Sequence, residues 1–260
     1  MKTIEPCILI EWKKLSRSKL PLITLALMML IPFMGAFFMF ILKDPSLAEG
    51  LGLISAKAQI MGVADWPSYL SLLSQAIAIG GLFAFGFVTS WIFGREYSDR
   101  TIKDLLALPI SRNTIVLAKF IVAIIWSLIL AIFVLILGLM LGVAINIPGM
   151  TENLLREGLR VYIISSSLTI LLSVPVGFVA SYGRGYLPPL AFIVVSLILA
   201  QIVAATGYGE YFPWSIPAII SMGLGGSNRS INKASIVIVL LTSTLGLFAT
   251  MFWWMYADQD

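Results

Sequence analysis

Six stretches without a charged residue, each 23 to 32 residues long, take up most of this chain. They are Leu20–Leu42, Trp66–Gly94, Phe120–Thr151, Val161–Gly183, Gly185–Gly209 and Ala234–Ala257. A helix needs about 20 apolar residues to cross a hydrocarbon core of about 30 Å. Irregular backbone cannot face lipid, and a charge at mid-membrane costs at least about 2.5 kcal/mol. The sequence therefore predicts an all-α membrane protein with six transmembrane helices, at about 20–42, 68–93, 113–145, 159–181, 187–206 and 234–256.

The composition argues against a soluble protein. Of the 260 residues, 59% are hydrophobic and only 12% are charged, whereas soluble domains carry roughly 25% charged residues. The net charge of +4 does not indicate nucleic-acid binding, because basic residues that flank spans have a topological explanation. With no histidine and only Cys7, no internal disulfide and no catalytic, cofactor-binding or metal-binding residue is predicted. No role is assigned to Cys7.

The distribution of basic residues predicts the topology. An even number of spans places both termini on one side, and eleven of the 17 Lys and Arg residues then fall on that side. These eleven are Lys2, Lys13, Lys14, Arg17, Lys19, Arg95, Arg100, Lys103, Arg112, Lys119 and Arg184. Because cytoplasmic segments carry an excess of Lys and Arg, we expect a multi-pass protein of the cell membrane with cytoplasmic N- and C-termini.

Residues 4–18 have the pattern of an amphipathic helix at the membrane interface. Its apolar residues fall within an arc of about 80° at 100° per residue. They are Ile4, Ile8, Trp12 and Leu15. Lys13, Lys14 and Arg17 lie on the opposite side, which suits a helix in the headgroup plane that binds membrane lipid. The alternative is a basic flank that only sets the topology.

The polar segment between the second and third predicted spans favours a short cytoplasmic helix at 98–108. Thr101 and Asp104 have the spacing of a capping box, although Ser98 or Asp99 also suits the first position. Proline cannot continue a helix, so the helix should end before Pro109. The apolar face consists of Ile102, Leu105 and Leu106. Together with the charges around it, this face suits docking to a soluble partner; the alternative is an ordinary basic loop.

The apolar stretch 211–226 is too short and too rich in proline and glycine to cross a membrane. Pro213, Trp214 and Pro217 favour a re-entrant or interfacial element on the outer side. Within the spans, Gly138 and Gly142 form a GxxxG pattern, which predicts close contact with another helix. Gln75 and Gln201 are amides inside predicted spans, and hydrogen bonding between helices is favoured over substrate binding for both.

The chain lacks the residues for independent energy conversion. No phosphate loop of the form G-x-x-x-x-G-K-[ST] occurs, so ATP hydrolysis is not expected on this chain. No acid, base or cation falls within a predicted membrane interior, whereas proton- and ion-coupled carriers usually need one. Both observations disfavour a pump or carrier that works alone.

One series of residues resembles a known family. Beginning at the end of the second predicted span, it reads E-x3-R-T-x3-LL-x2-P-x-SR-x6-K. The residues are Glu96, Arg100, Thr101, Leu105, Leu106, Pro109, Ser111, Arg112 and Lys119. This order resembles ABC-2-type transporter permeases. The outer Phe212–Pro217 segment is similar to small bacterial permeases of the bacitracin-resistance and lantibiotic-immunity type.

The resemblance implies a membrane subunit of an ATP-driven exporter, with an amphipathic peptide or a lipid-like compound as cargo. Two permease chains, as a homodimer or with a related permease, would pair with two cytoplasmic ATPase subunits that bind ATP and Mg. The segment from Arg95 to Pro109 would be the coupling helix, including Lys103 and Asp104, and Pro213, Trp214 and Pro217 would form an outer gate. Glu96 and Arg100 would form a polar relay. The alternatives are export of sodium or another substrate, and a non-transporting scaffold or regulatory subunit.

Overall fold

The computed structural model describes residues 4–43, 63–107, 109–225 and 232–257, and these are helical nearly throughout. The α-helices are α1 Ile4–Ser16, α2 Leu20–Lys43, α5 Trp66–Ser98, α6 Ile102–Leu106, α7 Arg112–Ala144, α8 Glu152–Leu172, α9 Val174–Tyr182, α10 Leu187–Ala205, α11 Ile216–Ser221 and α12 Lys233–Tyr256. Three 3₁₀ turns surround α11: η1 Gly209–Tyr211, η2 Pro213–Ser215 and η3 Met222–Gly225. Six helical segments in this part are long and apolar enough to span a membrane, which confirms the predicted fold class.

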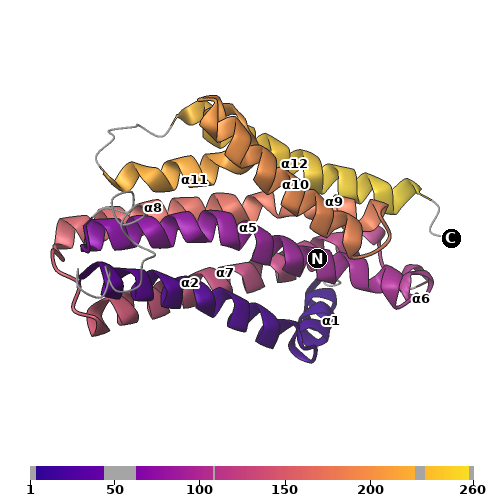
Figure 1. Ribbon diagram of the computed structural model, residues 1–260. Coiled ribbons are helices and arrows are strands. Elements are labelled where there is room, and N and C mark those ends of the chain that lie inside the picture. The colour runs from indigo at the N-terminus through magenta and orange to yellow at the C-terminus, as the bar shows by residue number, and fades with distance from the viewer. Residues whose placement is uncertain (1–3, 44–62, 108, 226–231, 258–260) are drawn as a thin grey trace.

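The long helices run side by side around α5, which packs against α2, α7, α8, α9, α10 and α11. Figure 1 shows α1 lying across one end of this bundle, the same end that carries α6 and the C-terminal end of α12. We call this the α6 end. The segment α11 lies alongside α8 in the opposite half of the bundle (Figure 1).

Local signals account for several helix boundaries. Helix α5 begins after Asp65, whose side chain accepts a hydrogen bond from the Ser68 backbone N–H at 2.9 Å. It continues to Ser98, five residues beyond the predicted end of the second span at residue 93. The Ser111 side chain caps α7 in the same way, by accepting from the backbone N–H of Thr114.

The fourth span begins earlier than predicted and is divided into two helices. It starts at Glu152, where the Thr151 side chain accepts from the Leu154 backbone N–H. Helix α8 ends at Leu172, and α9 resumes at Val174 with Pro175 in its first turn. Proline lacks a backbone N–H, so it cannot donate to the preceding turn. The interruption therefore follows directly from the sequence.

The two glycines of the GxxxG pattern lie at the contact between α7 and α5, as predicted. A Cβ atom on Gly138 would lie 2.7 Å from Cδ1 of Leu73, and one on Gly142 would lie 2.7 Å from the Trp66 ring. The Tyr69 hydroxyl donates to the Gly138 carbonyl at 2.8 Å. The absence of a Cβ at both positions therefore lets side chains of α5 pack directly on the α7 backbone, as the pattern predicts for a helix contact.

Candidate functional site at the α6 end

Four charged side chains meet inside the protein at the α6 end. Glu11 and Lys14 come from α1, Glu96 from α5 and Lys119 from α7, and we call them the charge quartet. Lys119 is fully buried, and Glu11 and Glu96 are only 7% and 3% exposed. The Lys14 ammonium lies 3.1 Å from Glu11 Oε1 and 2.8 Å from Glu96 Oε1. Three helices that are distant in sequence are thus joined by opposite charges.

The geometry explains why buried charges are tolerated here. The Lys119 ammonium donates to Glu11 Oε2 at 3.1 Å, to Glu96 Oε1 at 2.9 Å and to the Ile92 carbonyl at 3.1 Å. An ammonium has three N–H donors, so all of them are used. Two carboxylates balance two ammonium groups, and a buried ion is stable only when it is paired and hydrogen-bonded in this way.

Lys14 is the most accessible member of the quartet. Burial alone would lower its pKa, but the charge of Glu11 and the hydrogen bond to Glu96 outweigh that effect. The pKa of Lys14 is therefore raised above its ordinary value, and the side chain is protonated at neutral pH. Its positive charge holds α1 against the bundle.

A side-chain hydrogen bond connects the carboxylate of Glu96 to the start of α6, in addition to the backbone bond from the Thr101 N–H to the Glu96 carbonyl. The Thr101 hydroxyl donates to Glu96 Oε2 at 2.7 Å, so one carboxylate binds α1, α7 and the residue that precedes α6. Thr101 occupies the N-cap position of α6, but its side chain makes no capping hydrogen bond. The expected capping box with Asp104 is therefore wrong, because the hydroxyl bonds to the buried carboxylate instead.

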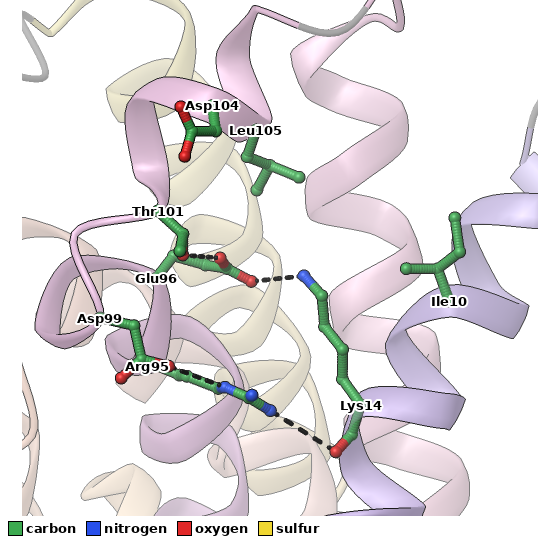
Figure 2. A pocket seen from close by; sticks show the side chains of 8 residues that line it. All are labelled: Ile10, Lys14, Arg95, Glu96, Asp99, Thr101, Asp104 and Leu105. Atoms are coloured by element: carbon green, nitrogen blue, oxygen red, sulfur yellow. Dashed lines mark hydrogen bonds and ion pairs between the residues drawn. The ribbon is translucent and has the colours of Figure 1, made fainter.

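A cavity of about 360 Å³ opens beside this hydrogen bond (Figure 2). It is lined by Ile10, Lys14, Arg95, Glu96, Asp99, Thr101, Asp104 and Leu105. The Arg95 side chain crosses its edge, donating to Asp99 Oδ2 at 3.0 Å and to the Lys14 carbonyl at 3.5 Å. Figure 2 shows Leu105 near Lys14 and Glu96, with Ile10 facing them from α1. The cavity thus lies between α1 and the start of α6.

The short helix between the second and third spans is shorter than the predicted 98–108. It is reduced to the five residues of α6, because Ser98 still belongs to α5. Its role in coupling stays a prediction. Arg100 turns the chain with a φ of 58°. It is exposed, and no ion pair joins it to Glu96 among the described residues, where Glu96 pairs with Lys14 and Lys119. A relay through Glu96 and Arg100 stays a prediction.

The predicted apolar face of this helix divides between the core and the surface. Ile102 is only 7% exposed and belongs to the hydrophobic core of the bundle, so it is not free to enter a partner. Leu105 is half-buried and lines the cavity, whereas Lys103, Asp104 and Pro109 are exposed. The side chain of Leu106 and all of residue 108 lie outside what the structure describes.

The N-terminal helix uses its apolar stripe differently from the expectation. Leu15 is fully buried, and Trp12 packs edge-on against Trp126 of α7 with ring centroids 6.1 Å apart. Ile8 also packs against the core, while Ile4 is half-exposed. The apolar stripe therefore faces mainly the bundle rather than lipid. The exposed apolar residues are Leu9 and Ile10, at 67% and 53%.

In the opposite half, the segment 209–225 forms η1, η2, α11 and η3; residue 226 lies outside the described part. Trp214 contacts the rings of Phe192 and Phe212, each at 5.5 Å between centroids. Pro213 is half-buried and Pro217 is buried, and the Pro217 carbonyl accepts a hydrogen bond from Ser165 of α8 at 3.2 Å. The element is thus packed into the bundle through α8 and α10.

Glu96 is singled out by the sequence, but its pairing with Lys14 and Lys119 is not, nor is the second buried carboxylate, Glu11. In the sequence, Lys119 counts only among the basic residues that set the topology and in the series of the family resemblance. The available signal was position: α7 begins at Arg112, so Lys119 lies seven residues, or about 10 Å, inside the helix. A lysine two turns inside an apolar helix requires a buried anion.

Comparison with known proteins agrees with this architecture. Residues 7–200 match the family described as ABC-2 family transporter protein. The chain is a member of the ABC-2 transporter family. It is also 30% identical, over 178 residues, to the bacitracin transport permease protein BCRB of Bacillus licheniformis. That alignment covers 68% of this chain and 85% of the relative.

Family membership fixes the general role of the molecule. ABC-2 permeases are multi-pass membrane subunits that generally work with a cytoplasmic ATPase, and they do not themselves carry out a chemical reaction. The permease described here is therefore a transport subunit. Its charge quartet and α6 lie together at the α6 end of the bundle.

Proposed function

We propose that this permease is the membrane subunit of an ATP-driven exporter that removes an amphipathic peptide antibiotic from the cell membrane. The similarity to a bacitracin transport permease supports this substrate class. The spans between the charge quartet and the outer element offer mostly apolar surfaces, which suit an amphipathic cargo better than a free ion. Two permease copies work with two ATPase subunits, which bind the ATP and Mg.

The observation that carries the proposal is the hydrogen bond from Thr101 to Glu96. It links α6 to a carboxylate that is simultaneously bonded to α1 and α7. When the ATPase subunits close on ATP, they move the α6 segment seated in them. Because the Glu96 side chain joins α5 to both α1 and α7, a displacement of α6 moves these three helices. A flexible loop in the same place would move without them.

Co-purification and transport test this function directly. The permease, expressed with the ATPase encoded beside it, should form a complex of two permeases and two ATPases by mass measurement in detergent. In lipid vesicles, an amphipathic cationic peptide should stimulate ATP hydrolysis, whereas sodium should not. A stable one-to-one complex with full transport would contradict the proposed stoichiometry.

Replacing Thr101 by valine tests the coupling step. Valine keeps the shape but removes the hydroxyl that donates to Glu96, and no helix cap is lost because Thr101 does not cap α6. We expect unchanged ATPase binding and several-fold less transport per ATP hydrolysed. Thr101→Ser, which retains the hydroxyl, is the control. Equal coupling in the valine and serine variants would show that this hydrogen bond transmits nothing.

Cysteine labelling tests the orientation. In a Cys7→Ser background, we expect an impermeant maleimide to label Met150→Cys but not Lys103→Cys in intact cells, with both labelled after permeabilisation. Both positions are exposed in the structure, so access is decided by the membrane alone. The reverse pattern would place α6 outside and would remove the basis for ATPase coupling.

Truncating Trp214 to alanine tests the outer element. Its ring contacts with Phe192 and Phe212 hold the element against α10, so their loss should loosen this region and reduce export several-fold. The amount of permease in the membrane and its ATPase binding should remain near the parent level. Tyr208→Ala, at an exposed position just before η1, should leave export unchanged. Loss of the Trp214→Ala protein from the membrane would indicate an anchoring role instead.

A further inference from the structure

A second cavity, also of about 360 Å³, lies between α5, α10 and the outer element. Its walls are largely aliphatic and include Ile79, Ile219 and Met222. Three polar side chains also line it: Gln201 near the end of α10, Glu210 in η1, and Ser215 in η2. The Ser215 hydroxyl already donates to the Gly209 and Phe212 carbonyls, so Gln201 and Glu210 are the two of interest. This combination of apolar walls with a few convergent polar groups is typical of small-molecule sites.

Glu210 supplies the charge of this cavity. Within the described residues, its carboxylate has no cationic partner within ion-pair distance; Oε2 accepts only from the Asn232 amide nitrogen, at 3.4 Å. Its backbone is fixed by α12, because the Ser235 hydroxyl donates to the Glu210 carbonyl at 2.9 Å. A positioned carboxylate that is not neutralised within the described part of the chain favours an incoming cation.

Gln201 adds an unused hydrogen-bonding group. The other intramembrane amide, Gln75, donates to Ser71 on its own helix at 2.9 Å. Gln201, in contrast, makes no side-chain hydrogen bond with another residue in the described ranges, although hydrogen bonding between helices was the expectation. Its amide oxygen is therefore available to accept from a ligand in the cavity that it lines.

The position of the carboxylate follows from the short length of α10. Helix α10 has 19 residues and α5 has 33, so α10 is about 20 Å shorter. Figure 1 shows that α10 stops short of the end of the bundle reached by α5 and α8, and that α11 lies alongside α8. Glu210 lies in η1, five residues after α10 ends at Ala205, and its bonds to Asn232 and Ser235 place it beside the start of α12. The carboxylate is therefore held where α10 ends and α12 begins.

We propose that this cavity binds the ammonium group of an amphipathic molecule. Glu210 holds the positive charge, the Gln201 amide oxygen accepts one ammonium N–H, and Ile79, Ile219 and Met222 cover the adjoining hydrocarbon. The inference rests on the proposed export function in treating such a compound as cargo. Two kinds of molecule carry such an ammonium group: a cationic peptide and an aminophospholipid, which has it in its headgroup.

The test uses dodecylammonium as the probe, with dodecanol as its uncharged counterpart. Equilibrium dialysis against the permease–ATPase complex in maltoside detergent should show saturable dodecylammonium binding that dodecanol does not match. Glu210→Gln should weaken this binding about tenfold or more, because a charge-assisted hydrogen bond becomes a neutral one. Gln201→Leu should weaken it several-fold. Glu157→Gln removes an exposed carboxylate on α8 and should bind like the parent.

The outcomes separate the site from the transport proposal. Equal binding of dodecanol and dodecylammonium, or full binding by Glu210→Gln, would overturn the ammonium site. Competition by a cationic amphipathic peptide would identify a peptide amine as the ligand, and competition by phosphatidylethanolamine but not phosphatidylglycerol would identify a lipid amine. Because the assay measures binding without turnover, a positive result stands even if transport fails. Intact peptide export by Glu210→Gln would reject the site while leaving the exporter proposal in place.

Discussion

Replacing Lys119 by methionine is expected to destabilise the permease more than any other single substitution considered for this chain. The change leaves Glu11 and Glu96 buried with only Lys14 to balance them. Removing one partner of a buried ion pair typically costs about 3–5 kcal/mol, because the remaining charge is uncompensated. We expect a marked fall in the apparent melting temperature, measured by size-exclusion chromatography after heating in detergent, and a lower yield from membranes.

Two further variants distinguish charge balance from packing. Lys13→Met removes an exposed lysine from α1, and its melting temperature should match that of the parent. The double variant Lys119→Met with Glu11→Gln restores neutrality among the buried groups and should recover part of the lost stability. If Lys119→Met melted at the same temperature as Lys13→Met, the charge quartet would contribute no net stability.

The features that could be predicted from the sequence are those determined by residues close together in the chain. Six helices were predictable because a bilayer excludes charge over about 20 residues, and the charge-free stretches mark that constraint directly. Two boundaries that the structure adds, the Ser111 cap of α7 and the break near Pro175, likewise reflect the hydrogen-bonding capacity of single residues. The contact of Gly138 with α5 was predictable because only small residues allow such close approach.

The features that the sequence did not predict depend on which residues meet in space. Lys119 is 108 positions from Glu11 and 23 from Glu96, and no local sequence pattern connects these three residues. Ile102 likewise fitted an amphipathic pattern, but a helix of five residues held close to the bundle buries one side of that pattern internally. Periodicity shows that a face is apolar; it does not show whether the face packs within the chain or against a partner.

Leu105 is a half-buried member of the predicted apolar face of α6, and replacing it gives the prediction that tests the proposed function most directly. Leu105 lines the cavity beside Thr101 and Asp104 at the α6 end of the bundle, where the proposed function places the ATPase. Fully burying a leucine contributes roughly 1.5–3 kcal/mol, and Leu105 is already partly buried within the permease. Leu105→Asp removes the free energy gained by burying the rest of this side chain against the ATPase and places a charge in a desolvated contact. Since about 1.4 kcal/mol corresponds to a tenfold change in the dissociation constant, we expect the affinity for the ATPase to fall about tenfold or more.

The measurement is co-purification of the ATPase with the permease, together with peptide-stimulated ATP hydrolysis in lipid vesicles. Leu105→Met conserves volume and apolarity and should bind and transport like the parent, which makes it the matched control. The elution profile of Leu105→Asp alone should show an intact permease, so that a loss of binding reports the contact rather than the fold. If Leu105→Asp binds the ATPase and exports peptide as well as Leu105→Met does, then α6 is an ordinary loop helix. Coupling must in that case enter the permease elsewhere, and the hydrogen bond from Thr101 to Glu96 serves only to pack α6 against the bundle.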